Sequence, residues 1–128
     1  PGKQAFSTDT CVPISRLADC VKAAKDEVAK SGLVCMIVGH VGDGNFHVLI
    51  TFDPNSADER QRAEVVADRI AHIAIGMGGT CTGEHGIGIH KLDALKAEHG
   101  EAVDVMRTLK NALDPNNIMN PGKTIPMQ

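Results

Sequence analysis

The sequence LVCMIVGHVGDGNFHVLITF, residues 33–52, contains two apolar runs separated by a glycine-rich turn. The first run, 33–41, is short enough to be a buried strand, and the second, 46–52, is rich in β-branched and aromatic residues. Between them, Gly42-Asp43-Gly44-Asn45 has the composition of a tight turn. The stretch therefore predicts a β-hairpin at the centre of the domain.

Helix and strand signals alternate on both sides of this hairpin. A strand signal and a helix signal precede it, and a capping box at residues 56–59 begins a long helix after it. The order β-α-β-β-α-β, followed by helices, predicts an α+β fold: a ferredoxin-like (split βαβ) antiparallel sheet with helices on one face plus C-terminal helices. The remaining expected elements are strands at 8–14 and 80–82, helices at 15–30, 92–99 and 101–113, and an irregular tail at 116–128. The helix that begins at the capping box is expected to end at the glycines of 76–79.

Composition narrows the class of protein. A chain of 128 residues suits a single domain with a real core. Its net charge of −3 and its lack of Trp and Tyr argue against a nucleic-acid partner. No apolar run approaches the roughly 20 residues of a membrane span, and the four widely separated cysteines are expected to be reduced.

Two histidines flank the predicted turn. If the hairpin folds back symmetrically, His40 and His47 lie about one strand spacing, ~5 Å, apart. Two imidazoles at that distance can share a divalent metal, and Glu84 in the segment Gly83-Glu84-His85-Gly86-Ile87-Gly88 is the natural third ligand. His85 would then be free for proton transfer.

A structural interpretation of the same residues stays open. A histidine pair on a hairpin is often just two polar residues at strand ends, and Asp43 is either a turn former or a residue that orients a ligand imidazole. The glycines of 83–88 do not follow the dinucleotide-binding order, which is G-x-G-x-x-G.

Three linked motifs resemble one family. GHVGDGNFH at 39–47, GTCTGEHGIG at 79–88 and LDPNNIMNPGK at 113–123 are similar to the C-terminal domain of FAD-linked oxidases of the vanillyl-alcohol oxidase superfamily. Within this superfamily the chain resembles the D-lactate dehydrogenases of the cytochrome type and the glycolate oxidase flavoprotein subunits. The resemblance extends over nearly the whole chain, from about residue 7 to 123.

The resemblance implies a site and its cofactors. The metal ligands would be His40, His47 and Glu84, binding Zn, Mn or Fe, and His85 would be the base. FAD would be held mainly by an N-terminal domain, with Asn120 and Lys123 of the tail returning to the flavin. Residues 1–128 would then be one domain, the second ferredoxin-like half of the substrate domain, and the FAD-binding domain would be absent from this chain.

The implied reaction is the oxidation of a small D-2-hydroxy acid, D-lactate or glycolate, to the 2-oxo acid. Relatives that act on 2-hydroxyglutarate carry Asn where this chain has Leu49 and Lys where it has Ser7, so a dicarboxylate substrate is not expected. The fragment alone should be inactive, with the FAD domain of the parent protein as its partner and a cytoplasmic location, or a mitochondrial one in a eukaryote. Two alternatives remain: a stand-alone ferredoxin-like module that binds or forms a homodimer without catalysis, and a hydrolytic metalloenzyme.

Overall fold

The structure, a computed structural model, describes residues 2–126 and divides the chain into two compact units. The first unit is Pro1–Glu84 and the second is His85–Gln128. Each unit is described by itself. No described helix is both long and apolar enough to cross a bilayer.

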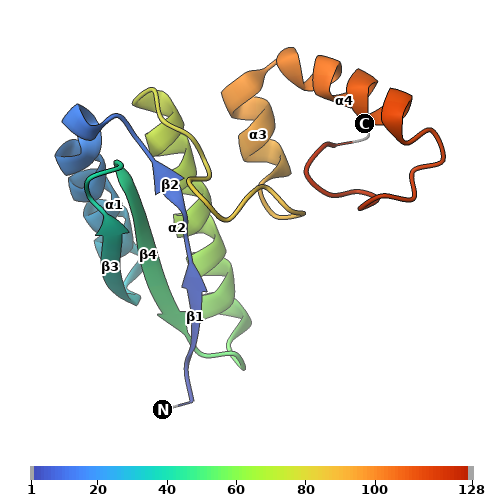
Figure 1. The fold of residues 1–128 in the computed structure, drawn as a ribbon. Helices are drawn as coiled ribbons and strands as arrows, with labels where there is room; N and C mark the ends of the chain where they lie inside the picture. Colours follow the sequence, from blue (N-terminus) through green and yellow to red (C-terminus); the bar gives the residue numbers. More distant parts are fainter. Residues whose placement is uncertain (1, 127–128) are drawn as a thin grey trace. The chain divides into compact units, whose positions relative to one another are not determined.

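The first unit is built around the predicted hairpin. Strand β3 (Val34–His40) pairs along its whole length with β4 (Asn45–Phe52), and the turn is closed by a hydrogen bond from Asp43 N to His40 O of 2.9 Å. On the other side of β4 lie two short strands in line, β1 (Gln4–Ser7) and β2 (Thr10–Cys11). All these pairings are antiparallel (Figure 1).

Two helices cover one face of this sheet. They are α1 (Leu17–Ser31), which follows a short 3-10 turn η1 (Ile14–Arg16), and α2 (Ala57–Gly76) (Figure 1). Alternate residues of β4 point toward them, as the two-residue period of a strand requires. The core consists of buried residues from β4 and both helices: Phe46, Val48, Ile50, Phe52, Cys20, Ala24, Val28, Ala63, Val66, Ile70 and Ala74.

The opposite face of the sheet is open. It carries the other set of alternating residues, and three apolar side chains of β3 there, Val34, Met36 and Val38, are 73%, 62% and 51% exposed. Polar residues gather where β3 meets β4, at the hairpin end of this face. The open face is therefore divided into an apolar region and a polar end.

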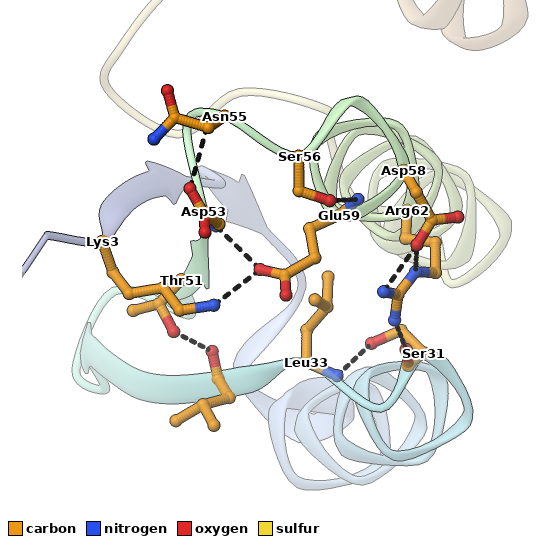
Figure 2. A network of polar contacts seen from close by, with 11 residues as sticks. Lys3, Ser31, Leu33, Thr51, Asp53, Asn55, Ser56, Asp58, Glu59 and Arg62 are labelled. Atoms are coloured by element: carbon orange, nitrogen blue, oxygen red, sulfur yellow. Dashed lines mark hydrogen bonds and ion pairs between the residues drawn. The ribbon is translucent and has the colours of Figure 1, made fainter.

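A polar network fastens the far end of β4 to the first turn of α2 (Figure 2). Ser56 caps the helix by accepting a hydrogen bond from Glu59 N, as the capping box predicts. The Glu59 carboxylate does not return to Ser56; it accepts hydrogen bonds from Lys3 Nζ and Asp53 N, both at 2.7 Å. These contacts, first the one from Lys3, lower the pKa of Glu59. The network joins the N-terminal strand, the β4 end and α2.

The second unit contains two helices and an irregular tail. Helices α3 (Leu92–His99) and α4 (Ala102–Leu113) are close to the predicted ranges. The tail has turns and bends but no helix or strand through residue 126, as its prolines predict. Asp114 fixes its beginning, because its carboxylate accepts hydrogen bonds from Ile118 N at 3.0 Å and Met119 N at 2.9 Å and contacts Lys110 Nζ.

The structure confirms the α+β class and corrects two predicted strands. The first strand does not extend to Ile14: β2 ends at Cys11, and Pro13 precedes the 3-10 turn. This turn also contains Ser15, the first residue of the helix predicted at 15–30. The last strand is reduced to a single bridge between Thr80 and Cys11. The four cysteines, all among the described residues, have reduced thiols, as expected.

Candidate metal site

The two histidines of the hairpin lie together at the polar end of the open face. His40 pairs with Asn45 and His47 pairs with Val38, so the register makes the two histidines diagonal neighbours on one face. Their ring centroids are 5.8 Å apart, and the rings meet edge to face at 88°. The separation is close to the one strand spacing that the sequence predicts. His40 is exposed, whereas His47 is only 8% exposed.

Glu84, the last residue of the first unit, lies next to the two histidines. Its Oε1 lies 3.1 Å from His47 Nε2 and 3.6 Å from His40 Nε2. Donors bound tetrahedrally to Zn at ~2.1 Å are about 3.4 Å apart, so this spacing fits one ion. Two imidazoles and a carboxylate are also a suitable donor set for Zn, Mn or Fe. The three predicted ligands are therefore brought together in a geometry that could hold a divalent cation.

The tautomer of His47 follows from its other nitrogen. His47 Nδ1 lies 3.1 Å from the carbonyl oxygen of Thr8, which can only accept a hydrogen bond. Nδ1 must then carry the proton, which leaves the lone pair on Nε2, the atom that faces Glu84. A fixed orientation of this kind is typical of metal-ligating histidines.

Asp9 is a site residue that the sequence analysis missed. It is 1% exposed, its Oδ1 lies 3.7 Å from His47 Nδ1, and its Oδ2 accepts hydrogen bonds from Thr82 Oγ1 and Glu84 N. One ligand atom from each of Asp9, His47 and Glu84 lies within 4.8 Å of the others. The available signal was an Asp inside a strand-like run, where that residue is disfavoured unless it has a specific partner.

At two positions of the motifs, neighbouring atoms lie so close that only glycine fits. A Cβ at Gly83 would lie 2.6 Å from the side-chain atoms of Asn45, and one at Gly44, where φ is +75°, would lie 2.1 Å from Val12 O. Asn45 itself is buried, and its Oδ1 has no hydrogen-bond partner among the described residues. The segment that carries Glu84 can thus pack on the start of β4 only because position 83 has no side chain.

The other predicted site residues belong to the second unit. His85 is its first residue, directly after Glu84 in the chain, and is exposed. Asn120 and Lys123 lie in the tail, both exposed, in a turn where Lys123 N donates to Asn120 O at 3.2 Å. Asn120 has a φ of +47°, a left-handed conformation that Asn tolerates better than most residues.

Several known proteins have sequences similar to this chain. Residues 1–124 match the family described as "FAD linked oxidases, C-terminal domain". The chain is 50% identical over 127 residues to "D-lactate dehydrogenase [cytochrome], mitochondrial" of Arabidopsis thaliana, covering 98% of this chain and 22% of that protein. It is 52% identical over 126 residues to "Probable D-lactate dehydrogenase, mitochondrial" of Danio rerio, covering 98% and 25%.

A bacterial relative extends the comparison. "Glycolate oxidase subunit GlcD" of Bacillus subtilis is 45% identical over 116 residues, covering 90% of this chain and 25% of the relative. The chain thus spans about a quarter of the length of these curated relatives. It belongs to the family of C-terminal domains of FAD-linked oxidases.

Proposed function

We propose that this chain is the substrate- and metal-binding part of a flavin-dependent D-2-hydroxy-acid dehydrogenase. The observation that carries the proposal is the convergence of His40 Nε2 and His47 Nε2 on one carboxylate oxygen of Glu84. These residues hold a divalent cation, Zn, Mn or Fe. When bound, the cation supplies positive charge beside the substrate's hydroxyl and carboxylate oxygens.

The reaction removes a proton from the hydroxyl oxygen and a hydride from C2, leaving the 2-oxo acid. FAD, when bound, accepts the hydride. His85 accepts the proton at an unprotonated ring nitrogen, the role for which an imidazole near neutral pH is suited. Its place directly after the ligand Glu84 supports this assignment, because the base must act on an oxygen held at the metal site.

The substrate is a small monocarboxylate, D-lactate or glycolate. Ser7 and Leu49 are cross-strand partners, and Met36 pairs with Leu49 from the other side. This row lies on the open face next to His47, two residues from it along β4, and carries no charge. A methyl group or a hydrogen on C2 is compatible with such a surface, whereas a second carboxylate would find no cationic partner in this row.

The tail contributes to flavin binding through Asn120 and Lys123, with Asn120 as the main contact. Asn120 is exposed, has a left-handed backbone and directly follows Met119, whose N–H is bonded to the Asp114 carboxylate. The partner is the FAD domain of the parent protein. The protein is mitochondrial in a eukaryote and cytoplasmic in a bacterium; two of the relatives named above are described as mitochondrial.

One observation favours a second function. The exposed apolar row of Val34, Met36 and Val38 would also suit a binding module without catalysis. Such a module needs neither a metal nor His85, so metal dependence and turnover separate the two functions.

Turnover by the flavin-loaded protein that carries this chain tests the proposal. With an artificial electron acceptor, we expect D-lactate or glycolate to be oxidised, chelation to abolish turnover, and added Zn²⁺ or Mn²⁺ to restore it. L-lactate is the control, because it presents C2 with the opposite hand. A flavin-loaded protein that oxidises no D-2-hydroxy acid, or whose turnover resists complete metal removal, contradicts the proposal.

A further inference from the structure

A buried carboxylate lies beside the candidate metal ligands and is assigned no role by the reaction. Asp9 is in the two-residue gap between β1 and β2. The flanking pairs Ser7↔Leu49 and Thr10↔Phe46 keep one register, which places Asp9 directly across from His47 on the open face. At 1% exposure, an ionised side chain is stable only when it is paired or hydrogen-bonded.

The hydrogen bonds of Asp9 connect it to the segment that carries Glu84. Its Oδ2 accepts from Thr82 Oγ1 at 2.8 Å and from Glu84 N at 2.9 Å. The second bond holds the backbone of the ligand residue itself. Both are charge-assisted bonds, which are shorter and stronger than neutral ones.

One other restraint on this segment acts at a distance from Glu84. The backbone bridge between Thr80 and Cys11 lies four residues earlier, with bonds of 2.8 and 3.3 Å. Between the bridge and Glu84 comes Gly83, whose backbone is intrinsically permissive. The Glu84 side chain is 51% exposed, so packing alone does not fix it.

We propose that Asp9 is a positioning residue for the metal site: by holding the Glu84 backbone, it sets this ligand before the ion binds. The inference rests on the proposed function that His40, His47 and Glu84 bind a divalent cation. Asp9 acts through Glu84. Loss of a residue that supports a metal ligand typically lowers metal affinity 10–100-fold.

The test is a Zn²⁺ titration of the 128-residue chain and its variants by calorimetry with a competing chelator. Asp9→Ala removes both acceptors, and we expect it to weaken Zn²⁺ binding about 10–100-fold. Asp9→Asn keeps one neutral acceptor and should lose less. Asp26→Asn is the matched control: it makes the same charge change at an exposed position of α1, away from the proposed ligands, and its affinity should stay within about twofold of the parent.

A double-mutant cycle separates positioning from general damage. In a Glu84→Ala background, Asp9→Ala should have little further effect, because the residue through which it acts is gone. An equal loss in both backgrounds would overturn the inference, as would parent-like Zn²⁺ binding by Asp9→Ala. A parent chain that binds no Zn²⁺ would overturn the proposed function, and the inference with it.

One further measurement needs no variant. In the parent chain, amide hydrogen exchange at Glu84 should be slow although its side chain is half exposed, because its N–H is bonded to a buried carboxylate. If Asp9→Ala does not fold, amide exchange in the parent chain decides whether Asp9 holds the Glu84 backbone. Exchange at Glu84 as fast as in an open loop would overturn the inference.

Discussion

Each of the two units contains a buried aspartate that accepts hydrogen bonds from another segment of the same unit, and the two aspartates differ in how far away that segment is in the sequence. Asp114 accepts hydrogen bonds from residues four and five positions ahead of it. Asp9 accepts them from residues 73 and 75 positions away. The first is a local clamp on a turn, whereas the second forms only when β2, β4 and the segment after α2 have come together.

This difference separates structure that a short segment can keep from structure that needs the whole sheet. The turn at Asp114 depends on one helix end and the residues after it. The proposed metal site depends on the hairpin, on the strand gap at Asp9 and on the segment ending at Glu84. Damage to the sheet should therefore abolish the site and leave the turn intact.

The largest expected effect concerns His85, which we expect to contribute to rate and not to fold. In the flavin-loaded enzyme, His85→Asn should keep metal and flavin but lower kcat on the order of 10²–10⁴-fold, the usual contribution of a positioned base. Steady-state rates normalised to flavin content measure it. His72→Asn, on α2, is the control and should leave the rate unchanged; a loss below about tenfold for His85→Asn would contradict the catalytic role.

A cavity in the core under the sheet should disrupt the proposed metal site and leave the turn at Asp114 folded. Ile50 is fully buried under both helices, and Ile50→Ala should lower the free energy of unfolding by about 2–5 kcal/mol. Chemical denaturation followed by NMR would show Glu84 signals lost before those of Ile118 and Met119. Leu109→Ala, at a 58% exposed position of α4, should change stability by no more than ~0.5 kcal/mol. Simultaneous loss of both regions in Ile50→Ala would show that they are not independent.

Substrate preference should respond to the uncharged row beside the site. Ser7→Lys combined with Leu49→Asn places a cation and an amide on facing strands, next to His47. The ratio of kcat/KM for 2-hydroxyglutarate to that for D-lactate should rise by about tenfold or more, because a hydrogen bond to a charged group contributes about 1.5–3 kcal/mol. Asp58→Asn, on the exposed start of α2, is a control for altered surface charge. An unchanged ratio would remove this row from the substrate site.

The smallest expected effect is the titration of the Asp114 carboxylate, which is confined to the turn that Asp114 holds. The hydrogen bond from Lys110, followed by those from Met119 and Ile118, lowers the pKa of Asp114 from its usual 3.8 to about 2 although burial raises it. A lowered pKa means that the clamp is fully present above about pH 4 and is lost as pH falls through about 2. The amide shifts of Ile118 and Met119 should titrate in that range, and Asp114→Asn should remove the titration. A midpoint near 4 would contradict the clamp.

The sequence predicted what local patterns encode. The hairpin, the four helices, the Ser56 cap and the end of α1 at Gly32 all follow from periodicity, turn composition and capping residues. The conjunction of His40, His47 and Glu84 was also predicted, since two of the three lie on one hairpin. The Lys110–Asp114 pair, at helical spacing, was readable in principle.

What escaped prediction depends on long-range register. Asp9 could be recognised only after β1 and β2 were known to pair with β4 so that position 9 lies across from His47. The first strand was predicted to extend to Ile14, whereas Pro13 in fact precedes a 3-10 turn. Glu59 likewise binds Asp53 and Lys3 because β1 and the β4 end supply closer donors than its own helix cap.

Metal analysis of the purified chain tests whether His40 and His47 bind a divalent cation. The parent chain, a His40→Ala/His47→Ala variant and a His72→Ala/His99→Ala control are loaded with Zn²⁺ or Mn²⁺ and dialysed, and bound metal per folded chain is measured. We expect about one ion in the parent and the control, and an affinity lowered on the order of 100-fold or more when His40 and His47 are removed. Bound metal in the His40→Ala/His47→Ala variant equal to that of the parent would contradict this expectation.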